Sequence, residues 1–159
     1  MKNIPTLYAW AGDMETFELL FTKFYNKVLK DELLGEVFKH MSPDHVKHVA
    51  HFVAEVFGGD KLYTTEDGGS HAGMIGKHIG KMLTEDKRQR WVQLLLQTAD
   101  EVGLKSDPEF RSAFVGYIEW GTRLAVINSQ LTTNPMNTNE PMPEWGWGET
   151  GGPYDPNEN

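Results

Sequence analysis

The sequence predicts an all-α fold followed by an irregular C-terminal extension. Apolar residues recur at intervals of three and four residues through four long segments, as one buried helix face requires. Capping residues precede these segments, and glycine follows two of them. No segment alternates apolar and polar residues as a half-buried strand would. These observations favour a helical domain without a sheet.

The N-terminal half is predicted to contain two long helices. The first begins at Asp13, whose carboxylate can cap it, and continues to about Lys30. A short turn or helix follows over residues 31–38. The stretch from Ser42 to Asp44 combines a capping hydroxyl, a proline and an acid, and predicts the start of the second helix. We expect that helix to end before Gly58, because glycine readily takes the left-handed conformation that closes helices.

The C-terminal half is predicted to contain two more long helices. Residues 60–73 have the composition of a loop, and a helical turn follows over about 71–79. Thr84 can cap a helix that runs to about Val102. Asp107 and a following proline open the last helix, which is predicted to run to about residue 129.

The composition changes after the last predicted helix. Residues 130–159 are rich in proline, glycine, asparagine and threonine, so a regular helix is not expected there. Trp145 and Trp147 are nevertheless large aromatic side chains that a free tail would expose to water. We therefore divide the chain into a globular domain, residues 1–129, and an extension, residues 130–159, that is expected to dock on it.

Composition and charge disfavour several classes of function. The chain has 159 residues, of which 39% are hydrophobic and 24% charged, and a formal net charge of −8. Nucleic acids and anionic membranes attract basic proteins, so neither is an expected partner. The basic residues Lys87, Arg88 and Arg90 lie among acids and are expected to form a solvated helix face. With no cysteine, no membrane-length apolar run and no signal-peptide pattern, the sequence favours a cytoplasmic location.

His78 is the first candidate for chemistry. A neutral imidazole is a good axial ligand for haem iron, and Met74 and Leu83 on either side of it could pack against a flat macrocycle. Trp91, thirteen residues later, offers a large indole with one N–H group for the wall of the same cavity. The alternative for His78 is an ordinary histidine at a helix end.

Tyr25 lies on the apolar face of the first long helix and has two interpretations. It could be a core tyrosine whose hydroxyl bonds to the backbone. It could also donate a hydrogen bond to a diatomic ligand. Bound dioxygen carries partial negative charge, so a buried donor favours it over carbon monoxide, and hydrogen bonds to charged groups contribute about 1.5–3 kcal/mol.

The other histidines give weaker signals. His45, His48 and His51 are spaced by three residues on one predicted helix, a spacing that drifts around the helix and makes a poor metal site by itself. His45 could face a cavity, whereas His48 and His51 are expected to face solvent. We expect no functional role for His40 or His71.

Tyr63 and Lys77 flank the expected pocket. They could be a loop aromatic and a solvated lysine, or they could hydrogen-bond and pair with two haem propionates. No other catalytic constellation is indicated, because serine, histidine and aspartate occur without a nucleophile-elbow context and the glycine pairs are not phosphate loops.

Taken together, these residues resemble the group II truncated haemoglobins over about residues 7–130. The tryptophan thirteen residues after the histidine is the mark of the second group. The extension, around Trp145 and Trp147, looks like one found in a bacterial subset of the family. The motifs that carry the resemblance are Leu7-Tyr8-Ala9-Trp10-Ala11-Gly12, Phe24-Tyr25 through Asp31, Phe38, Phe57-Gly58-Gly59, Tyr63, and the His78 to Trp91 spacing with Leu83 and Arg88 between.

The resemblance implies a two-over-two helical sandwich around haem b. By position, His78 is the proximal iron ligand, and Tyr25 and Trp91 are distal hydrogen-bond donors. His45 occupies a distal site where many members have a small residue; an imidazole there could donate a third hydrogen bond, fill the entry route or bind iron. The stretch before His78 lacks the arginine-rich run of some members. The other expected haem contacts are Phe38, Val49, Phe52, Met74 and Leu83, with Tyr63 and Lys77 near the propionates.

We therefore expect a protein that binds dioxygen and related small ligands. Firm distal hydrogen bonding fits redox chemistry, such as nitric oxide oxidation or peroxide reduction, better than bulk transport. Redox turnover would require a partner reductase, because no flavin or nicotinamide module is recognisable in the sequence. Two alternatives are a haem-based sensor that signals through the extension and a haem-free helical interaction domain.

Overall fold

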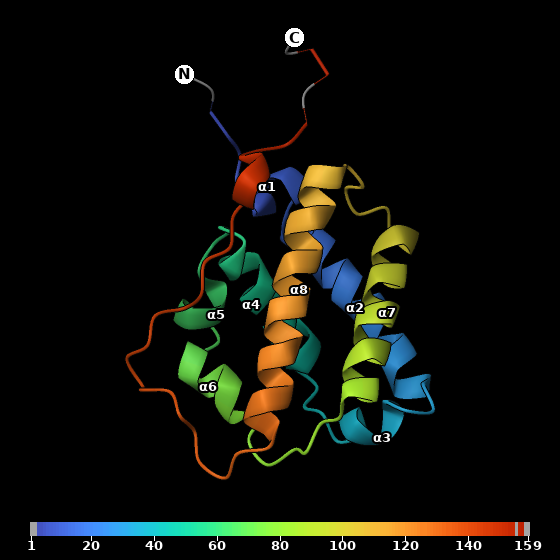
Figure 1. The fold of residues 1–159 in the computed structure, drawn as a ribbon, viewed down its shortest axis with the longest axis vertical. Coiled ribbons are helices and arrows are strands. Elements are labelled where there is room, and N and C mark those ends of the chain that lie inside the picture. The colour runs from blue at the N-terminus through green and yellow to red at the C-terminus, as the bar shows by residue number, and fades with distance from the viewer. Residues whose placement is uncertain (1–2, 155, 158–159) are drawn as a thin grey trace.

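The structure, a computed structural model, describes residues 3–154 and 156–157. Within these residues it is helical and contains no β-strand, which confirms the predicted fold class (Figure 1). A short 3-10 helix, Gly148–Thr150, lies in the extension. The α-helices are α1 (Leu7–Ala11), α2 (Met14–Lys30), α3 (Gly35–Phe38), α4 (His45–Val56), α5 (Leu62–Thr65), α6 (His71–Gly76), α7 (Glu85–Glu101) and α8 (Pro108–Ser129).

Four long helices form the body of the domain. Helix α2 packs against α4 and α7, and α7 packs beside α8. Figure 1 shows α7 and α8 next to each other, with α2 and α4 behind them. The core between the pairs is rich in phenylalanine, and burial of such side chains is the main favourable contribution to folding. Its fully buried members include Phe17, Leu20, Phe21, Phe24, Phe57, Leu95, Phe110 and Phe114.

Local sequence sets several helix ends as predicted. The Asp13 carboxylate accepts a hydrogen bond from the Thr16 backbone at 3.0 Å and so caps α2. Asp107 caps α8 in the same way, by accepting from the Phe110 backbone at 3.1 Å. Gly58 follows α4 with φ +94°, a conformation that a side chain would strain.

Several local predictions were wrong: Thr84, for example, precedes α7, but its side chain makes no capping hydrogen bond. Helix α4 begins at His45 rather than at Ser42, because the Ser42 carbonyl accepts from the His45 backbone at 3.0 Å in a preceding turn. Helix α5 lies in the segment predicted to be a loop, where the Glu55 carboxylate accepts from the Thr64 backbone at 3.1 Å. Helix α1, which Thr6 caps by accepting from the Ala9 backbone, was not predicted.

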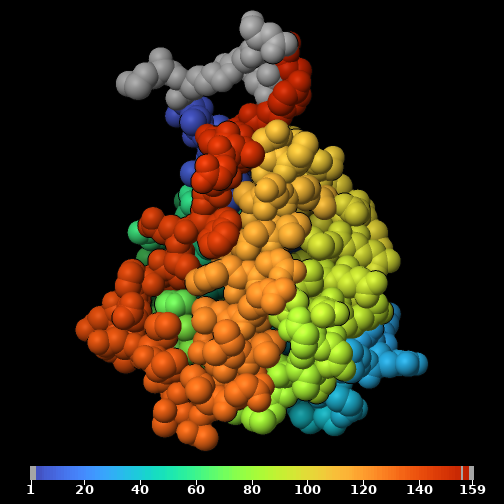
Figure 2. Space-filling model, viewed as in Figure 1, coloured from blue at the N-terminus to red at the C-terminus, as the bar shows by residue number. Residues whose placement is uncertain are grey.

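The extension crosses the domain from the end of α8 towards α1, and Figure 2 shows it as an orange-to-red band along one side of α8. Asn134 donates to the Ala72 carbonyl of α6 at 2.8 Å. The Trp145 indole donates to the Ala113 carbonyl of α8 at 3.0 Å, and the Trp147 indole donates to the Pro5 carbonyl at 2.8 Å. None of the described helices is long and apolar enough to cross a membrane.

Candidate functional site

A cavity of about 690 Å³ lies between the two helix pairs, and its lining is mostly apolar. This volume lies in the range of small-molecule and cofactor pockets. The structure brings nearly all of the predicted site residues to its wall; Tyr63 is the exception. The predicted residues that line it are Tyr25, Phe38, His45, Val49, Phe52, Met74, Lys77, His78, Leu83 and Trp91.

Tyr25 and Trp91 form a hydrogen-bonded pair on one wall of the cavity. The Trp91 indole N–H donates to the Tyr25 oxygen. Burial raises the pKa of the Tyr25 phenol far above its ordinary value, and the bond from Trp91 opposes that shift only in part. The Phe24 ring lies 4.9 Å from both the Tyr25 and the Trp91 ring and holds them in place. Because the indole N–H already donates to the phenol oxygen, the phenol O–H is free to donate elsewhere.

His45 stands beside this pair. Its ring meets the Tyr25 ring edge-to-face at 4.9 Å and the Phe38 ring at 6.1 Å. Desolvation, aided by the positive charge of Lys77 and by His78, lowers the pKa of His45 to about 4. The ring is therefore neutral at pH 7. Its Nε2 atom is buried and has no hydrogen-bond partner among the described residues.

His78 also lines the cavity, just beyond the end of α6. Its Nδ1 atom is 2.9 Å from the Met74 carbonyl oxygen, which can only accept, so Nδ1 carries the proton. Burial lowers the pKa of His78, an effect that the bond to Met74 opposes. The imidazole is thus neutral with its lone pair on Nε2. A histidine whose second nitrogen donates to a carbonyl is the usual arrangement of a metal-ligating imidazole.

Lys77 and Tyr63, the two residues predicted near propionates, have different surroundings. Lys77 is exposed at the cavity. Tyr63 is 2% exposed, packs edge-to-face on Phe52 at 5.1 Å and receives a hydrogen bond from the Ser70 backbone. The structure therefore does not bring Tyr63 to the cavity. Its ring also occupies the space beside Gly69, where an added Cβ would lie 2.3 Å from it.

The position predicted for Arg88 was wrong. It was expected on a solvated face, but its side chain is buried, lines the cavity, and pairs with Glu85 at 2.6 Å and Glu119 at 3.3 Å. The signal was present, because Arg88 lies three residues before Trp91 and seven before Leu95, on the same face of α7.

Several cavity residues were missing from the sequence-based list. The largest group comes from α8, whose apolar residues look like ordinary core. His71, for which no role was expected, also lines the cavity, and its Nδ1 lacks a partner among the described residues. The α8 residues are Tyr117, Ile118, Trp120, Gly121, Thr122, Leu124, Ala125, Val126 and Asn128; Pro143 adds a contact from the extension.

His51 corrects another prediction. It was expected to face solvent, but it is 4% exposed, and its Nδ1 lies 2.7 Å from the Asp67 carboxylate. Its Nε2 lies 3.7 Å from Glu18, and His48 lies 3.9 Å from Asp67. These contacts join α2, α4 and the loop after α5. No group of three or more residues in the described part of the chain has the geometry of a metal site.

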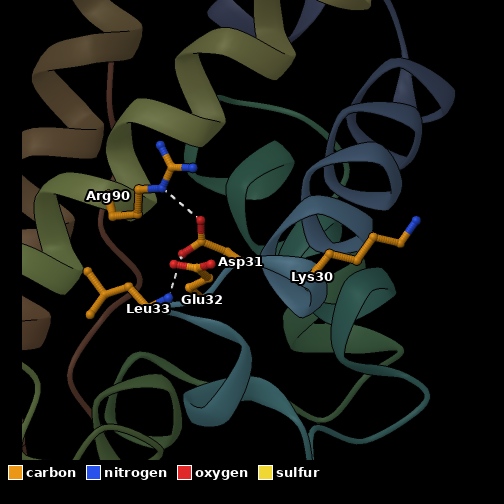
Figure 3. A pocket seen from close by; sticks show the side chains of 5 residues that line it. All are labelled: Lys30, Asp31, Glu32, Leu33 and Arg90. Atoms are coloured by element: carbon orange, nitrogen blue, oxygen red, sulfur yellow. Dashed lines mark hydrogen bonds and ion pairs between the residues drawn. The ribbon is translucent and has the colours of Figure 1, made fainter.

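A second hollow lies on the surface around Asp31 and Arg90 (Figure 3). The Arg90 guanidinium donates to the Asp31 carboxylate at 2.8 Å, and the same carboxylate accepts from the backbone of Leu33 and Leu34 at 3.1 Å. These bonds lower the pKa of Asp31, against the effect of burial. Because Asp31 and Arg90 are already paired with each other, we interpret this contact as a structural joint between α2 and α7.

Comparison with known proteins identifies the family of the chain. The sequence model for bacterial-like globins matches residues 6–119. The chain belongs to this globin family. It is 27% identical to the group 2 truncated haemoglobin YjbI of Bacillus subtilis over 128 residues, which cover 80% of this chain and 92% of that one.

Solved structures of globins place the chain among the group II truncated haemoglobins. The truncated oxygen-avid haemoglobin from Bacillus subtilis is 26% identical, with a TM-score of 0.67 over 77% of this chain and 99% of that one. The group II truncated haemoglobin from Bacillus anthracis is 25% identical, with a TM-score of 0.64 over 87% and 98%. The predicted truncated-globin fold and the resemblance to the second group are confirmed.

Membership of this family implies a haem cofactor and binding of dioxygen and other small diatomic ligands. The residues present fit a haem group. The mostly apolar cavity is lined both by an imidazole with a free Nε2 lone pair and by a buried donor pair. His45 Nε2 and His71 Nδ1 are buried polar atoms without partners among the described residues, as expected where a further group completes the site.

Proposed function

We propose that the chain binds haem b with His78 as the axial iron ligand and holds dioxygen on the opposite side through Tyr25 and Trp91. The observation that carries this proposal is the hydrogen bond from His78 Nδ1 to the Met74 carbonyl. It fixes the tautomer and the ring orientation, and leaves Nε2 as the ligand atom. Haem supplies reversible ligand binding and electron transfer, and the protein supplies orientation and donors.

The distal residues favour a polar ligand. The Tyr25 phenol stays protonated because burial raises its pKa, so it remains a donor across the physiological pH range. Trp91 fixes the phenol oxygen from the other side. His45, neutral and unpartnered at Nε2, is placed to add a third contact. The oxygen-avid Bacillus subtilis relative supports firm dioxygen binding in this chain as well.

Slow ligand release favours redox chemistry over transport. Dioxygen that is held firmly can react with nitric oxide, and a peroxide in the same position meets the same donors. Such turnover needs electrons from an external donor. The sensor alternative gains little from the structure, because the Trp145 and Trp147 indoles both donate to backbone carbonyls of the globin body.

The test is an absorption spectrum of the purified protein with and without added haemin, beside His78→Ala and the control Lys61→Ala, an exposed residue outside the cavity. We expect an intense Soret band in the wild type and the control, and a changed ferrous spectrum in His78→Ala. The absence of a Soret band after reconstitution would overturn the haem proposal. An unchanged ferrous spectrum in His78→Ala would place the axial ligand elsewhere.

A further inference from the structure

The segment from Lys77 to Arg90 is basic in an acidic protein. It carries five basic and two acidic side chains, a net charge of +3, whereas the whole chain has a net charge of −8. Arg88 and Arg90 are neutralised by Glu85, Glu119 and Asp31. Free positive charge is therefore left on the lysines of this segment.

These lysines surround the mouth of the cavity. Lys77, Lys81 and Lys87 all line it, and the first two are exposed. None of the three forms an ion pair with a described residue, although other basic side chains such as Lys39 do. Lys23 and Lys61 also lack an ion pair with a described residue, but neither lies at the cavity, so what distinguishes this site is that three unpaired lysines gather there.

An apolar surface lies next to the lysines. Met82 is 60% exposed, Ile127 62% and Leu131 36%. Figure 1 shows the loop between α6 and α7 passing beside the C-terminal end of α8. Two bonds hold it there: the Met82 backbone donates to the Ser129 carbonyl at 3.1 Å, and the Leu83 backbone donates to the Ser129 hydroxyl at 2.9 Å.

Met82 is also held in an unfavourable backbone conformation. Its φ is +51°, and it is the only residue other than glycine with positive φ in the described part of the chain. A glycine here would relieve the strain, yet the position carries a long apolar side chain that points into water. Methionine adapts its shape to different partners and is common at binding surfaces.

We propose that the surface formed by Lys77, Lys81, Met82, Lys87, Ile127 and Leu131, the rim patch, docks an acidic protein that donates electrons to the haem. This inference rests on the proposed function. An apolar centre with charged edges is the usual composition of a protein interface, and opposite charge orients the approaching partner. One electron leaves the partner's reduced flavin or iron–sulfur centre and converts ferric iron to ferrous, with no bond made or broken.

The position and charge of the rim patch favour this occupant over two others. The patch begins at Lys77, next to His78, so a docked donor lies beside the cavity. A second copy of the chain in a two-fold interface would bring lysines against lysines. An anionic membrane would attract the patch but repel a protein whose net charge is −8.

The test compares the double variant Lys81→Glu, Lys87→Glu with the control Lys23→Glu, Lys61→Glu. The control makes the same charge change at two exposed lysines outside the cavity. Reduction of the ferric protein by reduced acidic flavodoxin is followed by stopped flow at low and high salt. We expect the rim variant to be reduced at least tenfold more slowly, the control to stay within about twofold of wild type, and salt to remove the difference.

Other outcomes would overturn the proposal. Equal slowing in both variants would assign the effect to net charge, and equal rates would show that the rim patch does not dock the donor. Met82→Gly should remain folded but be reduced more slowly by flavodoxin. An unchanged rate would show that Met82 is not part of the docking surface. Loss of a dimer in the rim variant by sedimentation would favour a second copy. Dithionite should reduce all forms equally, and its failure to reduce the wild type would count against the proposed function instead.

Discussion

Removing the Tyr25 hydroxyl tests how the distal pair holds dioxygen. Tyr25→Phe deletes a donor whose bond to a partly charged ligand contributes about 1.5–3 kcal/mol, or one to two decades in dissociation rate. The structure reduces this expectation. Trp91 donates to the Tyr25 oxygen, so the substitution frees the indole N–H to turn to the ligand and recover about 0.5–1.5 kcal/mol. We therefore expect Tyr25→Phe to accelerate dioxygen release by only about tenfold.

The double variant Tyr25→Phe, Trp91→Phe tests whether Trp91 replaces Tyr25 as the donor or whether the two donors act independently. Trp91→Phe should have a smaller effect, about threefold, since the phenol O–H stays and loses only its orienting partner, a neutral hydrogen bond. With both donors removed no replacement is available, and release should accelerate by about a hundredfold, more than the product of the single effects. The assay is dioxygen displacement by carbon monoxide in a stopped-flow instrument. Tyr117→Phe, which removes another hydroxyl from a buried cavity tyrosine, is the control and should be silent. A double variant whose rate equals the product of the singles would refute the exchange.

Three further predictions follow from other parts of the structure. Folding lowers the pKa of His45 to about 4, so below about pH 6.5 the unfolded chain binds a proton on His45 that the folded chain does not. The free energy of unfolding should therefore decrease from pH 7 towards pH 4, and it should decrease less in His45→Leu. Urea unfolding at each pH measures this. Asp67→Asn weakens the bond to a buried histidine and should cost about 1–3 kcal/mol in urea unfolding, whereas the exposed neighbour Glu66→Gln should cost nothing measurable. Trp145→Ala removes a ring that packs on cavity-lining aromatics at 5.6 and 5.7 Å and should speed haem transfer to apomyoglobin, whereas Trp147→Ala should lower Tm without that effect.

Helices that are stabilised locally could be predicted from the sequence. Asp13 and Asp107 cap their helices because the side chain bonds three residues ahead, a relation visible in the sequence. The start of α4 could not be predicted in the same way. Ser42 has the chemistry of a cap, but its hydroxyl accepts weakly from Asp44 at 3.3 Å within a separate turn. Helix α5 likewise depends on the Glu55 carboxylate, which belongs to another helix.

The cavity residues could be predicted where they lie on helices with clear faces. The partners of those residues could not, because a partner distant in sequence decides what a side chain does. His51 has the sequence context of a surface residue, and only the approach of Asp67 from the loop after α5 allows it to be buried. Arg88 is buried for the same reason, since Glu119 arrives from α8. The contribution of α8 to the cavity was missed because its apolar residues gave no sign of which face points inward.

His45 and His78 both line the cavity, and their different hydrogen-bond partners indicate which of them ligates the iron. Both imidazoles are neutral at pH 7, and either could ligate iron. His78 is already held by its bond to the Met74 carbonyl, so coordination through Nε2 costs it little conformational entropy. No hydrogen bond to a described residue holds His45 through Nε2, and its ring packs against the aromatic rings of Tyr25 and Phe38. It would have to be immobilised to coordinate iron, which favours His78 as the permanent ligand. We therefore expect His45 to contact the bound ligand, so His45→Leu should change the rate of dioxygen release. The ferric spectra of His45→Leu and of the wild type should be alike, and neither should show a second nitrogen ligand on the iron.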